Sequence, residues 1–107
     1  MLEKRRHRRV AVNVPVILRH GGRLLPATMM NLSCGGMLLR TEGSDISAEG
    51  PVEVIFDLGE YGKDISMRGR ITRLDTASEE ADMGVQFTNL FSISHKAIQE
   101  YLRKNLN

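Results

Sequence analysis

The chain has 107 residues, of which 41% are hydrophobic and 26% charged, and this composition is typical of one soluble globular domain rather than of a disordered or membrane-spanning protein. No apolar run approaches the roughly 20 residues that cross a bilayer, the charged N-terminus argues against a secretory signal peptide, and the single cysteine, Cys34, excludes an internal disulfide. We therefore expect a cytoplasmic protein that does not insert into a membrane.

The net charge of +2 is distributed unevenly along the chain. Residues 1–9 hold five cationic side chains and one carboxylate, a net charge of +4, so the remaining residues together carry −2. A short basic arm on a near-neutral body favours a compact anionic ligand over nucleic acid, because nucleic-acid binders usually spread positive charge over a face of the fold. The arm cations are Lys4, Arg5, Arg6, Arg8 and Arg9.

The arm is followed by a segment in which apolar and other residues alternate. This period of two predicts a β-strand over residues 10–19 with one buried face, made of Val10, Val12, Val14, Val16 and Leu18. Pro15 cannot donate a ladder hydrogen bond, so we expect a sheet edge or a bulge there. The run His20-Gly21-Gly22-Arg23 is typical of a hairpin turn, which leads into a second strand over about residues 24–32.

Four further strands are predicted, over residues 37–41, 51–58, 65–75 and 83–88. A polar loop (42–50), a turn (59–64) and an acidic loop (77–82) separate them. In the fifth strand, alternation places every second residue on the same face, namely Ile65, Met67, Gly69, Ile71 and Arg73.

The apolar period then lengthens, which predicts an amphipathic helix over residues 92–106. Its stripe would contain Ile93, Ala97, Ile98, Tyr101 and Leu102, serving either as core or as a docking face. Ser92 or Ser94 could cap its start. We therefore expect a single, predominantly all-β domain over residues 1–107: a flexible basic arm (1–9), a six-stranded antiparallel β-barrel (10–90) and a C-terminal helix (92–106).

Residues suited to catalysis are scattered. His7, His20 and His95 do not fall at metal-ligand spacing with one another or with Cys34. The sequence contains no nucleophile elbow, phosphate-binding loop or dinucleotide fingerprint. We expect no enzymatic activity, no metal and no cofactor.

Two motifs carry chemical information. Arg5-Arg6-His7-Arg8-Arg9 offers guanidinium groups, which bind phosphate in a bidentate manner, stack on bases and read the O6/N7 edge of guanine. Alone, such a run is also typical of a solvated charged tail.

The second motif is Asn31-Leu32-Ser33-Cys34-Gly35-Gly36. Strand alternation would place Met30 and Leu32 in the core and point Asn31 and Ser33 outward. Gly36 would allow a positive φ or the close approach of a ligand. Alone, a turn of this composition is common between strands.

Together the motifs are more specific. Arg5-x-x-x-Arg9 followed by Asn31-x-Ser33-x-x-Gly36 resembles the PilZ domain family, whose hallmark is an RxxxR arm and a (D/N)xSxxG turn. That resemblance implies a six-stranded barrel with a C-terminal helix, and a receptor for cyclic diguanylate (c-di-GMP). The arm arginines would grip phosphate and guanine, and the turn residues would meet the guanine edge or phosphate. The implied ligand-binding residues are Lys4, Arg5, Arg6, Arg9, Asn31, Ser33 and Gly36, with Lys4 helping to hold a second ligand molecule.

We accordingly predict a receptor whose arm changes conformation over the barrel on binding c-di-GMP and which signals through an unidentified effector protein. Two alternatives remain at this stage. One is a non-binding adaptor of the same fold, and the other is a small RNA- or DNA-binding barrel. The latter would require exposed aromatic side chains on the strands, for which the candidates are Phe56, Tyr61, Phe87, Phe91 and Tyr101.

Overall fold

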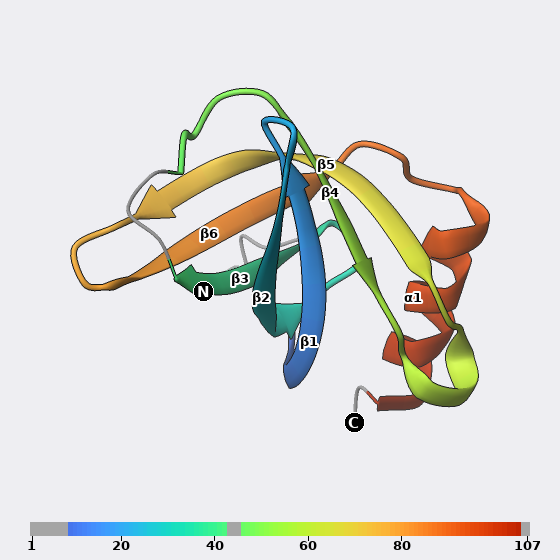
Figure 1. Cartoon of the computed structure of the whole chain (residues 1–107). Coiled ribbons are helices and arrows are strands. Elements are labelled where there is room, and N and C mark those ends of the chain that lie inside the picture. The colour runs from blue at the N-terminus through green and yellow to red at the C-terminus, as the bar shows by residue number, and fades with distance from the viewer. Residues whose placement is uncertain (1–8, 43–45, 106–107) are drawn as a thin grey trace, which may run out of the picture.

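The computed structural model describes residues 9–42 and 46–105. Within them, six strands form a closed antiparallel barrel in the order β1-β2-β3-β6-β5-β4 (Figure 1). This confirms the predicted fold. The strands are β1 (Val10–His20), β2 (Arg23–Leu32), β3 (Gly36–Glu42), β4 (Pro51–Phe56), β5 (Ile65–Asp75) and β6 (Glu80–Phe87), with a short 3-10 helix η1 (Gly59–Tyr61) and the helix α1 (Ile93–Asn105).

The inner face of β1 forms as the alternation predicts. Val16 and Leu18 are buried in the core, and Val10, Val12 and Val14 pack against it while their neighbours point outward. Residues 17–20 of β1 pair with β4, so Pro15 lies beyond this pairing and faces β2 opposite Thr28. The missing N–H of Pro15 is therefore tolerated at a local sheet edge, as expected.

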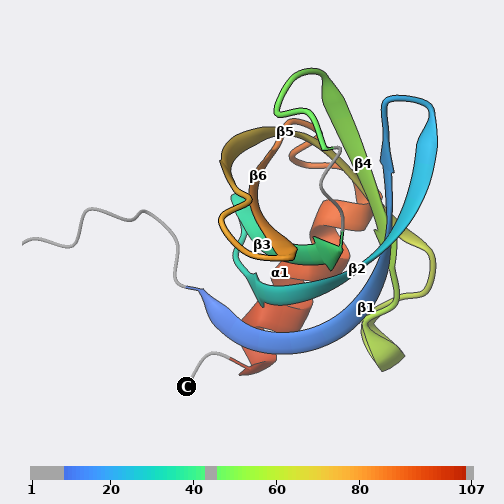
Figure 2. The ribbon, with the colours of Figure 1, turned by 60° about the vertical axis from the view of Figure 1, so that its left-hand side comes forward.

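Helix α1 lies across one opening of the barrel, as Figure 2 shows. Ile98 and Leu102 belong to the hydrophobic core, which resolves the open question in favour of a core role for the stripe. The helix start is fixed by Ser92, whose Oγ accepts the His95 N–H at 3.1 Å. Ser94 has another role, since its Oγ accepts the N–H of Ser66 on β5 at 3.1 Å.

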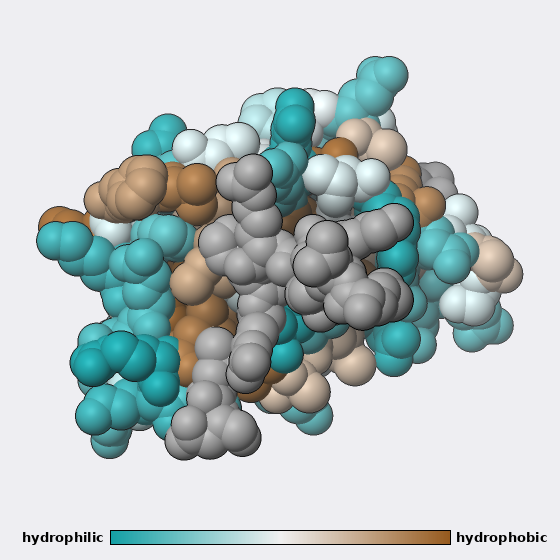
Figure 3. All heavy atoms as spheres, turned by 180° about the vertical axis from the view of Figure 1, so that it is seen from behind, coloured by the Kyte–Doolittle hydropathy of each residue, from teal (hydrophilic) through white to brown (hydrophobic). Residues whose placement is uncertain are grey.

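The N-terminal turn of α1 departs from the predicted stripe. Ile93 is 88% exposed, whereas His95 is buried at 3% exposure. Phe91 and Leu90, in the segment between β6 and α1, are also exposed. This segment lies at the upper left of Figure 3, where hydrophobic residues (brown) are exposed along the edge of the view.

Two details of β5 and β6 differ from the sequence prediction. β6 begins at Glu80, not at residue 83, because Ala81 is fully buried and the charged residues beside it point outward. In β5, the register shifts between Ile71 and Arg73. Arg73 is consequently exposed, and Leu74 points inward in its place. The prediction that Arg73 shares a face with Ile65, Met67, Gly69 and Ile71 is therefore wrong.

Candidate ligand-binding site

The end of the basic arm and the polar turn meet in space. Ala11 pairs with Asn31 and Val10 pairs with Leu32 across the β1–β2 ladder. This pairing brings Arg9 beside the turn, where its Nη1 donates a hydrogen bond of 2.9 Å to Asn31 Oδ1. The other predicted arm residues, Lys4, Arg5 and Arg6, lie outside the described residues.

Asn31 owes its orientation to a bulge. The β2–β3 register shifts between Met29 and Asn31, leaving Met30 as an extra residue in β2. Met29 and Leu32 are fully buried, while Met30 and Asn31 are both half-buried on the outer side. The prediction that Met30 lies in the core is therefore wrong, whereas Leu32 is in the core as predicted. Asn31 does point outward, as β-bulges often re-aim side chains near sites.

Ser33 does not point outward as predicted. It is only 3% exposed, and its Oγ accepts the N–H groups of Gly35 and Gly36 and donates to the carbonyl of Gly36, all at 3.2 Å. These bonds satisfy backbone groups that the tight turn would otherwise leave unpaired. Ser33 thus builds the turn from inside.

Gly36 is required for a reason that differs from the expected one. Its φ is not positive, and it is buried at the start of β3, opposite Gln86 of β6. A Cβ at this position would lie 2.1 Å from the carbonyl oxygen of Val85. The glycine therefore allows β6 to approach the turn, which is a packing requirement.

Cys34, between these residues, is half-buried. Burial raises the pKa of the Cys34 thiol, so the thiol is neutral and a poor nucleophile.

A hollow of about 420 Å³ opens beside the Arg9–Asn31 pair. Arg9, Asn31, Thr72 and Arg73 supply its polar side chains, and no lining residue in the described part of the chain is acidic. Its apolar lining consists of Ala11, Met30, Met37, Leu38 and Gly84. A purely cationic hollow with amide and hydroxyl donors suits an anionic ligand.

Sequence reasoning missed Thr72 and Arg73. Both lie at the β5 bulge, which turns Arg73 to the outer side of the barrel. The only signal in the sequence was the density of arginines in this strand, namely Arg68, Arg70 and Arg73, and strict alternation assigned Arg73 to the wrong face.

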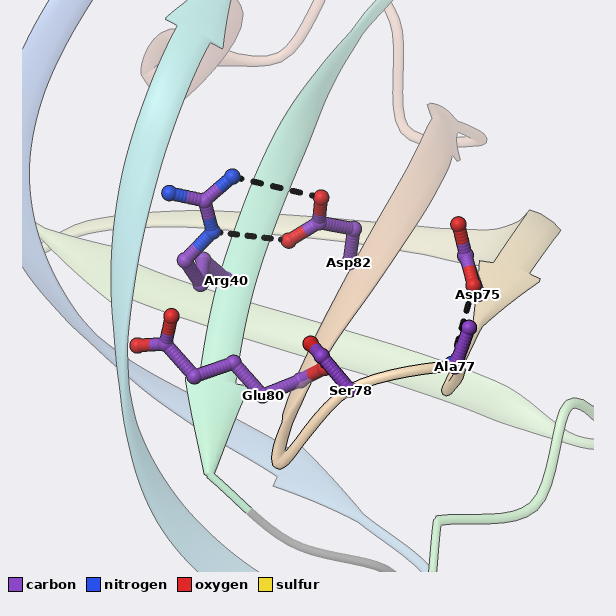
Figure 4. Close-up of polar contacts among 6 residues, drawn as sticks. All are labelled: Arg40, Asp75, Ala77, Ser78, Glu80 and Asp82. Atoms are coloured by element: carbon purple, nitrogen blue, oxygen red, sulfur yellow. Dashed lines mark hydrogen bonds and ion pairs between the residues drawn. The ribbon is translucent and has the colours of Figure 1, made fainter.

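An ion pair lies on the outer face next to this hollow. Arg40 and Asp82 are directly opposed on β3 and β6, two residues beyond the Leu38–Gly84 pair. The guanidinium donates to both carboxylate oxygens, at 2.8 and 3.3 Å (Figure 4). The hydrogen bond from Arg40, assisted by the charges of Arg40 and Arg73, lowers the pKa of Asp82 against a smaller effect of desolvation.

Two larger hollows, of about 780 and 600 Å³, surround the β1–β2 hairpin. The first contains Arg23 and Glu49, and the second contains Arg19, Arg68 and Glu53. Arg19 and Glu53 form an ion pair at 3.3 Å. Each of these two hollows contains a carboxylate, which makes it a poorer site for an anion than the hollow at Arg9, whose described lining contains none.

Two general features complete the description. Within residues 9–42 and 46–105, no three His, Cys, Asp or Glu side chains are grouped so that they could hold a metal ion. No helix in that part of the chain is long and apolar enough to span a membrane.

The fold is similar to several solved structures. The Bacillus subtilis inhibitor of motility MotI/DgrA superposes with a TM-score of 0.76 at 19% identity, covering 99% of this chain and 53% of its own. The PilZ domain with c-di-GMP of YcgR from Escherichia coli gives 0.76 at 14% identity, covering 95% of this chain and 91% of its own. The MrkH–c-di-GMP complex of K. pneumonia gives 0.73 at 19%, covering 96% and 52%.

The chain thus spans about half the length of MotI/DgrA and MrkH, and most of the YcgR domain. No curated protein sequence matches it. The sequence profile of the PilZ domain, however, matches residues 3–104. Because this match covers nearly the whole chain, the protein belongs to the PilZ domain family.

Proposed function

We propose that this PilZ domain is a receptor for c-di-GMP that catalyses no reaction and passes its signal to a partner protein. The observation that carries the proposal is the Arg9–Asn31 hydrogen bond of 2.9 Å at the rim of a hollow with two arginines and no carboxylate among its described lining residues. The ligand has two phosphates and two guanines, and it needs cations, donors and stacking planes in one place.

Each residue of the site has a proposed role that follows from the chemistry of its side chain. In this proposal Arg9 contacts phosphate or the O6/N7 edge of a guanine. The side-chain oxygen of Asn31 accepts a hydrogen bond from Arg9. The amide N–H₂ of Asn31 is then the group that donates to acceptors on the guanine or phosphate. Arg73, on β5, adds a second cation to the hollow. Ser33 and Gly36 maintain the shape of the turn and do not contact the ligand.

Arg5 and Arg6 are proposed to complete the site from the arm, with Lys4 admitting a second ligand molecule. Ordering of the arm over the barrel would cost conformational entropy, which charge-assisted hydrogen bonds must offset. The surface created by the ordered arm is the proposed signal to the effector protein.

The distribution of aromatic side chains weighs against an RNA- or DNA-binding barrel. Phe56 and Phe87 are buried, and Tyr61 and Tyr101 pack edge to face with ring centroids 5.4 Å apart. Phe91 is exposed but is not among the residues lining the cationic hollow. The described strands therefore offer no stacking platform for successive bases.

Calorimetric titration tests the proposal directly. The chain should bind c-di-GMP and should bind GTP and a short single-stranded RNA far more weakly. The absence of binding to c-di-GMP would favour the non-binding adaptor, and tighter binding to RNA would favour the nucleic-acid barrel.

A further inference from the structure

His95 is a buried side chain whose two ring nitrogens both have partners. Nδ1 lies 3.2 Å from the backbone nitrogen of Phe91, and Nε2 lies 2.7 Å from the carbonyl oxygen of Cys34. A backbone N–H can only donate and a carbonyl can only accept, so Nδ1 must be unprotonated and Nε2 must carry the hydrogen. The geometry thus fits the neutral imidazole in its Nε2–H form.

The partner on the Nε2 side is the middle of the turn that holds Asn31. Cys34 is 61 residues away in sequence, and the Ser33 hydroxyl bonds to Gly35 and Gly36 of the same turn. Gly35 is also fixed from outside, since its carbonyl accepts the N–H of Phe87 at 2.9 Å. Ser33 shapes the turn internally, whereas His95 ties it to the helix.

The partner on the Nδ1 side is a strained residue. Phe91 has a φ of 67°, in a region that bulky residues rarely adopt, and its side chain is 84% exposed. The hydrogen bond to Nδ1 helps to hold this conformation. One imidazole therefore connects the turn beside the cationic hollow with the segment that leads into α1.

We infer that His95 is a positioning residue for ligand binding: its Nε2–H fixes the turn carbonyl of Cys34 and thereby the placement of Asn31 against the ligand. This inference rests on the proposed function, because it names a residue outside the hollow that sets its geometry. The Nδ1 bond stabilises the fold at Phe91, and only the Nε2 bond acts on the turn.

The two bonds can be separated by substitution. In His95→Gln the side-chain amide nitrogen takes the place of Nε2 and keeps a donor for Cys34, while in His95→Asn the amide oxygen takes the place of Nδ1 and keeps an acceptor for Phe91. We expect His95→Gln to bind c-di-GMP within about threefold of the wild type and His95→Asn to bind about tenfold more weakly, the loss of roughly one hydrogen bond. Both should melt at a similarly lowered temperature, since each loses one bond.

Equal affinities of the two variants would overturn the inference, because a merely structural histidine would not distinguish them. If the wild type binds no c-di-GMP, the proposed function fails, and hydrogen exchange tests separately whether the Nε2–H bond fixes the turn. The Gly35 and Gly36 amides should then exchange more slowly in His95→Gln than in His95→Asn, and equal rates would contradict it. Should both variants unfold, a long-range ¹H–¹⁵N spectrum of the wild type that places the hydrogen on Nδ1 would rule it out.

Discussion

Arg9 Nη1 and Asn31 Oδ1 lie 2.9 Å apart, in a hydrogen bond between residues 22 positions apart in sequence. The bond orients the amide of Asn31 and directs one arm guanidinium towards the cationic hollow. Groups that are already oriented lose less entropy on binding. The pair therefore prepares the site, and its coupling can be measured.

A double-mutant cycle on Arg9 and Asn31 should reveal that coupling. Arg9→Ala should weaken c-di-GMP binding by about 10-fold to 150-fold, from roughly 1.5–3 kcal/mol for a lost charged hydrogen bond. Asn31→Ala should weaken binding less, and the double variant should lose less than the product of the two, because the residues act as a pair. Calorimetry gives the affinities.

Arg23→Ala provides the matched control, since Arg23 is also exposed and lies in the hairpin rather than at the hollow. It should leave the affinity unchanged. All these variants should retain the wild-type melting transition, because the substituted side chains lie outside the core. If the loss of affinity in the double variant equals the product of the two single losses, Arg9 and Asn31 act independently and the predicted coupling is wrong.

Ser33→Ala should destabilise the fold. Removing the hydroxyl leaves the N–H groups of Gly35 and Gly36 without their acceptor in a buried turn, which costs about 1–3 kcal/mol. Ser47→Ala is a suitable control, because the Ser47 hydroxyl accepts the N–H of Glu49 at 3.1 Å in an exposed loop. Urea denaturation should separate the two variants, and equal stabilities would mean that the turn is satisfied in another way.

Gly36→Ala should be severely destabilising, because the new methyl group would meet the backbone oxygen of Val85 at 2.1 Å and backbone cannot move aside cheaply. Gly84→Ala should be mild by comparison. There the nearest atom is the side-chain Oγ1 of Thr72 at 3.3 Å, which can rotate away. Thermal melting of the two variants tests the contrast, and similar melting temperatures would contradict it.

The sequence predicts the structure well wherever burial keeps alternating along a strand, as it does in β1 even though the register of β1 against β2 shifts between Ala11 and Val14. The inward face of β1 and the amphipathic period of α1 follow directly from apolar spacing, and so does the barrel. The bulges at Met30 and at Thr72 were not readable, because an extra residue in a strand depends on pairing with partners far along the chain. Each bulge changes which side chain reaches the hollow, so strict alternation misses Arg73 and places Met30 in the core.

Two other errors have local causes. Continuing the strand alternation into the turn predicts that Ser33 points outward, but there the hydroxyl satisfies the backbone instead. The apolar period places Ile93 in the helix stripe, whereas in the structure Ile93 is exposed and His95, with two backbone partners, is buried. Hydrophobicity alone does not rank these two residues correctly.

The Arg40–Asp82 pair predicts a pH dependence of stability. The pKa of Asp82 is lowered in the folded protein, so the pair contributes stability above the unfolded value of about 3.9 and loses it as the pH falls through the folded pKa. Asp82→Asn should therefore be slightly less stable than the wild type at neutral pH, and the difference should vanish in acid. The effect is small because both side chains are partly exposed, and solvent screens an ion pair of this kind. Urea denaturation at a series of pH values measures it, and a difference that grows in acid would give the opposite sign.

Lys4 is predicted to set the ligand stoichiometry. The arm carries Lys4 and four arginines, more positive charge than the two phosphates of one c-di-GMP require. Two stacked ligand molecules bring four phosphate charges together, and nearby cations must offset their repulsion. We therefore expect two ligand molecules per chain.

Lys4→Leu should lower the ratio towards one while keeping most of the affinity for the first molecule, whose contacts with Arg9 and Asn31 are unchanged. Salt should weaken the second binding step more than the first, because the second depends more on exposed charge. Calorimetry at two salt concentrations measures both effects, with Lys63→Leu as a control for the loss of a lysine elsewhere on the surface. If the wild type saturates at one ligand per chain at low salt and high ligand concentration, the prediction is wrong and Lys4 is an ordinary solvated side chain.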